Sequence, residues 1–120
     1  MPNETKDQFE IRFTPEFKRN LRALAKKYRH IRSDVQTVID QLQAGNIVGE
    51  QVPHIGYTIY KVRVRNSDLQ KGKSAGYRLL YYLQTNSSII LITIYSKSDQ
   101  SDISSAEVRR IVGEVKPPTG

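Results

Sequence analysis

The sequence contains no cysteine and only two histidines. The lack of cysteine excludes disulfide frameworks, thiolate nucleophiles and zinc sites built on thiolates. The histidines, His30 and His54, fall in turn or loop positions and make no metal-ligand spacing with carboxylates. We therefore expect no metal site, and acid–base chemistry would fall to lysine, tyrosine or carboxylate side chains.

Long hydrophobic runs are also absent. The longest, Ile89 to Ile94, is interrupted by Thr93 and is far shorter than the roughly 20 residues of a membrane-spanning helix. The N-terminus, MPNETKDQFE, is polar and acidic, unlike a signal peptide. These features predict a soluble cytoplasmic protein without a membrane partner. We expect a single domain over residues 1–120, with frayed ends at 1–7 and 116–120.

One glycine is missing where a nucleotide site would need it. Gly72-Lys73-Ser74 matches the end of a phosphate-binding P-loop, but position 67, where the motif requires glycine, is Ser67. The residues that follow, Tyr77 to Leu83, are aromatic and aliphatic and predict a strand rather than a helix start. A nucleotide-binding P-loop is therefore disfavoured.

Positive charge is abundant and unevenly distributed. Nineteen lysines and arginines oppose twelve acidic residues, giving a net charge of +7. Between Tyr57 and Tyr82 there are six basic residues and one acidic residue, Asp68. A small domain this basic is typical of proteins that bind nucleic acid, and a solvated basic surface is the alternative.

Capping signals predict three helices. Thr14-Pro15-Glu16 supplies an N-cap, an N1 proline and a first-turn acid. Ser33 to Gln36 forms a capping box for a second helix that ends at Gly45, and Ser104 to Glu107 forms another for the last helix. The first two helices are close enough in sequence to form a hairpin, which we interpret as scaffold.

Alternating or continuous apolar patterns predict four strands, and Gly49 to Gly56 reads as a loop. The strands are expected at Gln8–Phe13, Ile59–Arg65, Tyr77–Leu83 and Ile89–Tyr95. The last is apolar on both faces, which indicates a central position. The resulting order, β-α-α-β-β-β-α, predicts an α+β fold: a small antiparallel sheet with the helical hairpin packed on one face.

Cations follow the predicted strands. Lys61, Arg63 and Arg65 share one face of a strand, because side chains alternate with a period of two. Further cations lie on the next connection, the next strand and just after the last strand: Lys71, Lys73, Arg78 and Lys97. If the helices cover one face, these cations converge on the other, where they would suit a phosphodiester. An ordinary solvated face is the alternative.

Two other residue sets are less informative. Six tyrosines in the sheet half could stack on bases of single-stranded RNA, although core packing is the better interpretation for any one of them. Asp99 and Asp102 form an acidic pair beside Lys97 and are expected to support the turn and the helix dipole rather than bind a metal.

Three stretches resemble the RelE/ParE superfamily of bacterial type II toxins, nearest its RelE and HigB branch. They are Tyr60 to Val64, Gly72 to Tyr82, and Leu91 to Ile103. The resemblance covers nearly the whole chain, and the predicted order of elements agrees with that fold.

The resemblance implies a toxin that is a ribosome-dependent mRNA endoribonuclease and is inhibited by a cognate antitoxin. In such a reaction a ribose 2′-OH attacks its own 3′-phosphate, without a metal or a small-molecule cofactor. The reaction leaves a cyclic phosphate and a free 5′-OH. It requires a base, cations for the developing charge, and an acid for the leaving oxygen.

Individual roles follow from the same resemblance. It implies that Arg78 holds the scissile phosphate, that Lys61 and Arg63 supply base and charge stabilisation, and that Lys97 is an acid or a phosphate clamp. Lys73 would contact substrate, and we assign further RNA-binding roles to nearby basic or aromatic residues: Arg65, Lys71 and Tyr95.

The sequence departs from the family pattern in two places. Many RelE members carry a catalytic tyrosine near the start of the last helix, where this chain has Ser104-Ser105, so Tyr95 is the candidate substitute. Arg63 stands where lysine is common, and arginine is a poor base. The base therefore stays open, and Lys61 would have to be uncharged near neutral pH to serve. Two other functions share the fold: ParE-like gyrase inhibition without cleavage, and non-catalytic binding of RNA or the ribosome.

Overall fold

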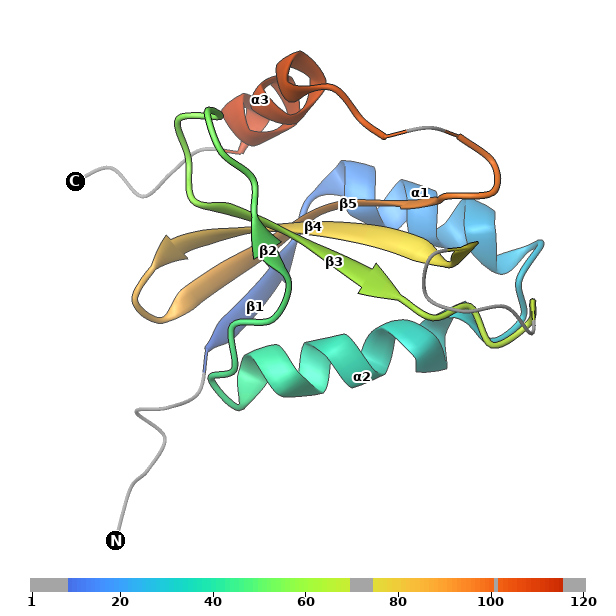
Figure 1. Ribbon diagram of the computed structural model, residues 1–120. Coiled ribbons are helices and arrows are strands. Elements are labelled where there is room, and N and C mark those ends of the chain that lie inside the picture. The colour runs from blue at the N-terminus through green and yellow to red at the C-terminus, as the bar shows by residue number, and fades with distance from the viewer. Residues whose placement is uncertain (1–8, 70–74, 101, 116–120) are drawn as a thin grey trace, which may run out of the picture.

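The computed structural model describes residues 9–69, 75–100 and 102–115. Its helices and strands are shown in Figure 1. In chain order they are β1 (Glu10–Phe13), α1 (Pro15–Ala25), α2 (Ile31–Gln43), β2 (Glu50–Gln51), β3 (Ile59–Val64), β4 (Tyr77–Thr85), β5 (Ser88–Ser96) and α3 (Ser105–Glu114). The predicted α+β fold is confirmed.

The five strands form one sheet in the order β1-β5-β4-β3-β2. β3, β4 and β5 make the expected antiparallel meander, and every residue of β5 is buried. β1, however, pairs with β5 in parallel, so the sheet is mixed rather than purely antiparallel. β5 lies inside the sheet, as its two apolar faces predict.

The segment predicted to be entirely loop, 49–56, contains a short strand. Glu50 and Gln51 form β2, which pairs antiparallel with Lys61 and Tyr60 of β3. Both β2 residues are exposed, so the sequence carries no alternation to reveal a strand. Gly49 allows this approach: its φ is +92°, and a Cβ there would lie 2.6 Å from the Lys61 carbonyl oxygen.

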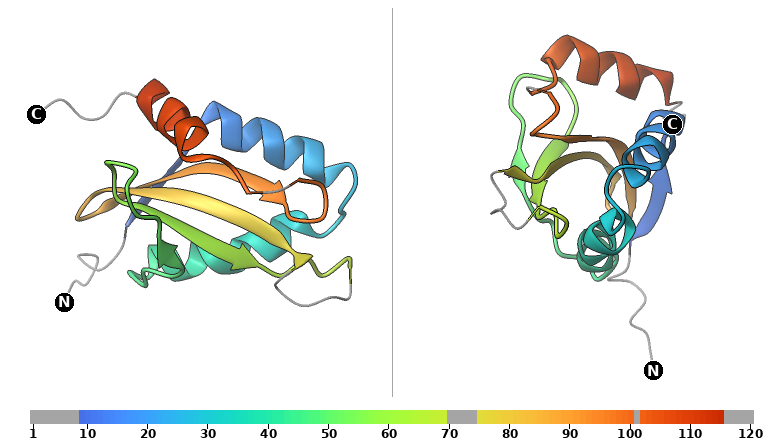
Figure 2. Two further views of the ribbon diagram at one scale, coloured as in Figure 1. Left: turned by 45° about the horizontal axis from the view of Figure 1, so that its top comes forward. Right: turned by 90° about the vertical axis from the view of Figure 1, so that its right-hand side faces the viewer.

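Helices cover both faces of the sheet (Figure 2). α1 and α2 pack on one face, where buried side chains from the strands meet Phe17, Ile31 and Leu42. α3 packs on the other face through Val108, Ile111 and Val112. The expected helical hairpin therefore occupies one face, and α3 covers part of the second.

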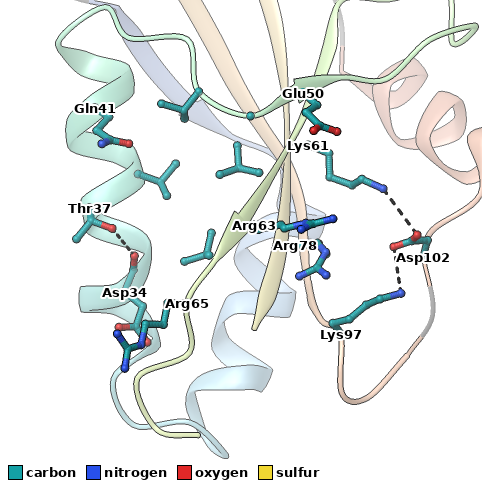
Figure 3. Close-up of a pocket in the computed structure, with 15 residues that line it drawn as sticks. Asp34, Thr37, Gln41, Glu50, Lys61, Arg63, Arg65, Arg78, Lys97 and Asp102 are labelled. Carbon is teal, nitrogen blue, oxygen red and sulfur yellow. Dashed lines mark hydrogen bonds and ion pairs between the residues drawn. The ribbon is translucent and has the colours of Figure 1, made fainter. Parts of the chain in front are cut away.

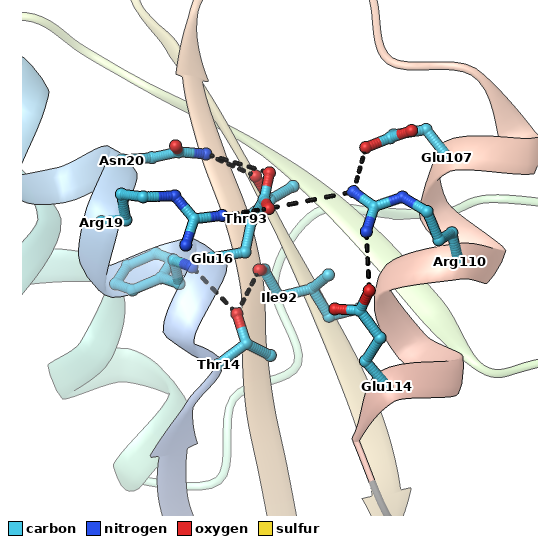
Figure 4. Close-up of polar contacts among 10 residues, drawn as sticks. Thr14, Glu16, Arg19, Asn20, Ile92, Thr93, Glu107, Arg110 and Glu114 are labelled. Atoms are coloured by element: carbon cyan, nitrogen blue, oxygen red, sulfur yellow. Dashed lines mark hydrogen bonds and ion pairs between the residues drawn. The ribbon is translucent and has the colours of Figure 1, made fainter.

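α1 begins where its capping signal predicts. The Thr14 hydroxyl accepts a hydrogen bond from the Phe17 N–H at 2.9 Å. The same hydroxyl donates to the Ile92 carbonyl of β5 at 2.6 Å, and Thr14 is buried (Figure 4). One side chain thus caps the helix and ties its first turn to the sheet.

α2 begins two residues before the predicted capping box. Its N-cap is His30, whose own side chain makes no capping bond. The His30 N–H instead donates to the Asp68 carboxylate at 3.0 Å, and Ser33 donates to the His30 carbonyl. The prediction of a start at Ser33 was wrong because a carboxylate distant in sequence stabilises this helix end.

α3 begins at its predicted capping box, where Ser104 accepts from the Glu107 N–H at 3.1 Å. Arg110 links α3 to α1, because its guanidinium lies 3.9 Å from the Glu16 carboxylate and also contacts Glu107 and Glu114 (Figure 4). Within the described ranges, no helix is both long and apolar enough to cross a membrane.

Replacing Thr14 with valine should destabilise the fold by about 2 kcal/mol, because the isosteric side chain removes a helix cap and leaves a buried carbonyl without its donor. Urea unfolding measures the change. Ser104→Ala is the matched control, since this exposed cap makes no second bond to the sheet, and it should cost about 1 kcal/mol. Equal costs for the two variants would contradict a dual role for Thr14.

Candidate functional site

The alternation of β3 separates its apolar and basic side chains. Tyr60, Val62 and Val64 pack in the core beneath α2. Lys61 and Arg63 therefore project from the opposite face of the sheet, as their spacing predicts. This face is the one that α3 only partly covers.

β4 brings a further cation beside them. Arg78 is the direct cross-strand partner of Arg63, and it is 5% exposed. Gly76 permits the close approach of the two strands, because a Cβ there would lie 2.1 Å from the Val64 carbonyl oxygen. Like charges directly opposite each other destabilise a sheet. Arg63 and Arg78 therefore place two positive charges side by side on this face.

An acidic residue joins the cations from the segment after β5. The Asp102 carboxylate lies 3.5 Å from the Lys97 Nζ and 3.8 Å from the Lys61 Nζ (Figure 3). The Asp102 side chain is 54% exposed, and the two lysine side chains are about one-third exposed. The carboxylate thus bridges Lys61 of β3 and Lys97, which directly follows β5, and it stays open to solvent.

Tyr95 fixes this carboxylate from below. Its ring is buried in the core under α3, and its hydroxyl donates to Asp102 Oδ1 at 3.0 Å while accepting from the Ile103 N–H at 3.4 Å. Burial raises the pKa of Tyr95 to about 12, so the hydroxyl stays protonated. Its hydrogen bond, followed by the charges of Lys61 and Lys97, holds the pKa of Asp102 below its ordinary value of 3.8.

These residues line one cavity, here called the basic pocket. Its charged lining comprises five cations, Lys61, Arg63, Arg65, Arg78 and Lys97, and three carboxylates, Asp34, Glu50 and Asp102. Residues of α2 and the Gly49–Glu50 segment also border it. In Figure 3 the side chains of Lys61, Arg78 and Lys97 extend toward the same space beside Asp102. An anionic group of the size of a phosphate would meet positive charge from three directions.

The predicted site residues are largely brought together. Lys61, Arg63, Arg78 and Lys97, assigned to chemistry, and Arg65, assigned to RNA contact, all line the basic pocket. Lys71 and Lys73 lie outside the described residues. Tyr95 is 5% exposed, and this burial does not support a role for its ring in stacking on a base.

Three carboxylates at the pocket had no assigned role in it: Asp34, which lay in a predicted capping box, Glu50 and Asp102. Asp102 was expected to support a turn, and Glu50 lay in a presumed loop, yet both line the basic pocket. No periodic pattern marks either residue, because one sits in an irregular segment and the other in a two-residue strand. The nearness of Asp102 to Lys97 in sequence was the one available signal.

Within the described part of the chain, no group of three or more histidine or acidic side chains is arranged to hold a metal ion. The polar groups of the basic pocket are mainly hydrogen-bond donors, which suit an anion.

Comparisons with known proteins show the family to which the chain belongs. A model of the family described as the RelE toxin of the RelE/RelB toxin-antitoxin system matches residues 17–114, so the chain belongs to this toxin family. Among solved structures, a double arginine-to-alanine mutant of E. coli toxin RelE in the free state is similar in fold. The TM-score is 0.54 at 17% identity, over 91% of this chain and 99% of the other. No curated protein sequence matches the chain.

Replacing Tyr95 with phenylalanine should raise the pKa of Asp102 toward 3.8, because the largest contribution to its lowered value is removed while the ring still packs. Carboxyl ¹³C NMR titration measures this shift. Because the pKa of Asp102 is lower in the folded than in the unfolded protein, the ionised carboxylate stabilises the fold above about pH 3.8. This stabilisation is lost as the pH falls through the folded-state pKa. Wild type should therefore lose more stability than Tyr95→Phe on acidification.

Tyr82→Phe is the matched control for this experiment. Tyr82 lies elsewhere on the same face of the sheet, where its ring contacts Tyr57. The control should leave the Asp102 titration unchanged, and an identical titration in Tyr95→Phe would show that the hydroxyl does not influence Asp102.

Proposed function

We propose that this RelE-family toxin is a ribosome-dependent endoribonuclease that cleaves mRNA by attack of a ribose 2′-OH on the adjoining phosphodiester. Cleavage of translated mRNA would block protein synthesis and arrest growth. The observation that carries the proposal is the convergence of Lys61, Arg78 and Lys97 in one pocket. A metal ion has no assigned part in the reaction.

Arg78 is the residue proposed to hold the scissile phosphate. A guanidinium presents paired N–H donors that match two phosphate oxygens, and it keeps its charge throughout the reaction. Arg78 lines the pocket and is nearly excluded from solvent. Electrostatic stabilisation of a phosphorane is strongest where water is excluded.

The remaining cations divide between charge stabilisation, proton donation and binding. Lys61 and Arg63 neighbour Arg78 and would stabilise the developing negative charge. Lys97 can donate a proton to the leaving 5′ oxygen. Arg65, at the end of β3, would contact the RNA backbone outside the cleavage site, and Lys71 and Lys73 are proposed to extend that contact.

Family membership implies an antitoxin protein as a partner. The ribosome and the mRNA are partners under the proposed function. A pocket lined by more cations than carboxylates suits an RNA backbone, whose phosphates supply most of the affinity in such complexes.

Arg78→Ala should abolish cleavage of translated mRNA, and Arg78→Lys should reduce the rate by about 100-fold or more, because lysine keeps the charge but lacks the two-pronged donor geometry. Primer extension on transcripts after induction maps the cleaved ends. Incubation of purified protein with translated and naked mRNA tests the requirement for the ribosome.

Arg22→Ala is the matched control, because it removes an equal charge from the exposed surface of α1 and should leave cleavage unchanged. Transcript ends identical in wild type and Arg78→Ala would contradict the assignment of the site. Growth arrest with gyrase-linked DNA damage and intact transcripts would favour a ParE-like inhibitor instead. Ribosome binding without cleavage would indicate a non-catalytic module.

A further inference from the structure

The cations of the basic pocket leave one chemical requirement unmet. Attack by a ribose 2′-OH needs a group that accepts its proton. Protonated lysine and arginine side chains donate hydrogen bonds but have no lone pair with which to accept a proton. The acceptor must come from another residue or from a lysine that has first lost its own proton.

Asp102 supplies an acceptor in the right place. Its carboxylate lies between the Lys61 and Lys97 ammonium groups, at 3.8 and 3.5 Å. The Asp102 side chain is 54% exposed, so a hydroxyl can approach its carboxylate from the pocket. The Tyr95 hydroxyl holds Oδ1 at 3.0 Å and thereby directs the carboxylate toward the pocket.

The other carboxylates near the pocket are less well placed. Glu50 lines the pocket from β2, but within the described residues no hydrogen bond or ion pair orients its side chain. Asp34 accepts hydrogen bonds from the N–H and the hydroxyl of Ser67 at the far end of the cavity. Asp99 is bound to Lys27 at 2.9 Å and does not line the pocket.

We propose that Asp102 is the general base that accepts the proton of the attacking 2′-OH, an inference that rests on the proposed function. The 2′ oxygen forms a bond to phosphorus while its proton passes to Asp102. The bond from phosphorus to the 5′ oxygen breaks, and that oxygen takes a proton from the Lys97 ammonium. The products are a 2′,3′-cyclic phosphate and a 5′-OH.

The contact between Asp102 and Lys97 also returns the site to its starting state. After cleavage Asp102 holds one extra proton and Lys97 lacks one. Because the two groups lie 3.5 Å apart, the proton can pass between them directly or through one water molecule. Each turnover therefore leaves both residues as they began, with no net exchange of protons with solvent.

The groups around Asp102 determine the pH range in which its carboxylate is ionised. The groups that face it are Lys61 from β3, Tyr95 and Lys97 from β5 and the segment after it, and the more distant Arg63 and Arg78. The hydrogen bond from the Tyr95 hydroxyl, followed by the positive charges of Lys61 and Lys97, keeps the pKa of Asp102 below 3.8. Asp102 is thus ionised across the neutral range, and its protonation would reduce activity only in acid.

The test is single-turnover cleavage of mRNA on purified, programmed ribosomes. Asp102→Asn keeps an oxygen that can accept from Tyr95 but removes the proton acceptor. Its cleavage rate should fall by about 100- to 10,000-fold. The affinity for the programmed ribosome should be unchanged or tighter, because a negative charge beside the phosphate is lost. Asp102→Glu should recover part of the rate.

Asp99→Asn is the matched control, since it makes the same change in the same segment but outside the pocket, and it should cleave like wild type. The second readout is the pH profile of wild type. With Asp102 as base the cleavage rate stays level through the neutral range, whereas a lysine base would give a rise of about tenfold per pH unit.

Each outcome decides between the claims. The assignment of Asp102 is overturned if Asp102→Asn cleaves at the wild-type rate, or if the wild-type rate rises steadily with pH. Either result leaves the proposed function standing. A wild-type protein that cleaves neither translated nor naked mRNA overturns both. The wild-type pH profile decides the question even if Asp102→Asn fails to fold.

Discussion

The period-two alternation of side chains along β3 and β4 is the constraint from which the site follows. Each strand must bury one row of side chains beneath α1 and α2, and the intervening residues are then forced onto the opposite face. Burial of Val62 and Val64 on one face thereby places Lys61 and Arg63 on the other. A shift of one residue in strand pairing would bury the cations and expose the core, so the register that stabilises the fold also assembles the pocket.

The strands alone do not complete that pocket. The segment after β5 folds back so that Asp102 lies against Lys61 and Lys97, and Tyr95 anchors this return through a hydroxyl at the end of a buried ring. The same ring packs with Val108 and Ile111 of α3. The position of the carboxylate therefore depends on how α3 is seated on the sheet, although α3 itself contributes no side chain to the pocket.

Sequence patterns predict the parts of this molecule that local physics determines. Capping chemistry located α1 and α3, and alternation placed Lys61 and Arg63 on the face opposite Val62. The start of α2 escaped prediction because Asp68, distant in sequence, binds the His30 N–H. β2 was not predicted because its two residues are both exposed and show no alternation of apolar and polar side chains. Asp102 lies in an irregular segment, so only the folded chain shows that it meets Lys61.

The pairing of Arg63 with Arg78 has a consequence for the stability of the protein. Arg63 and Arg78 are direct cross-strand partners, and like charges in such positions oppose sheet formation. Any polyanion that enters relieves this self-repulsion. Ligand affinity and thermodynamic stability are thus linked through the same two side chains.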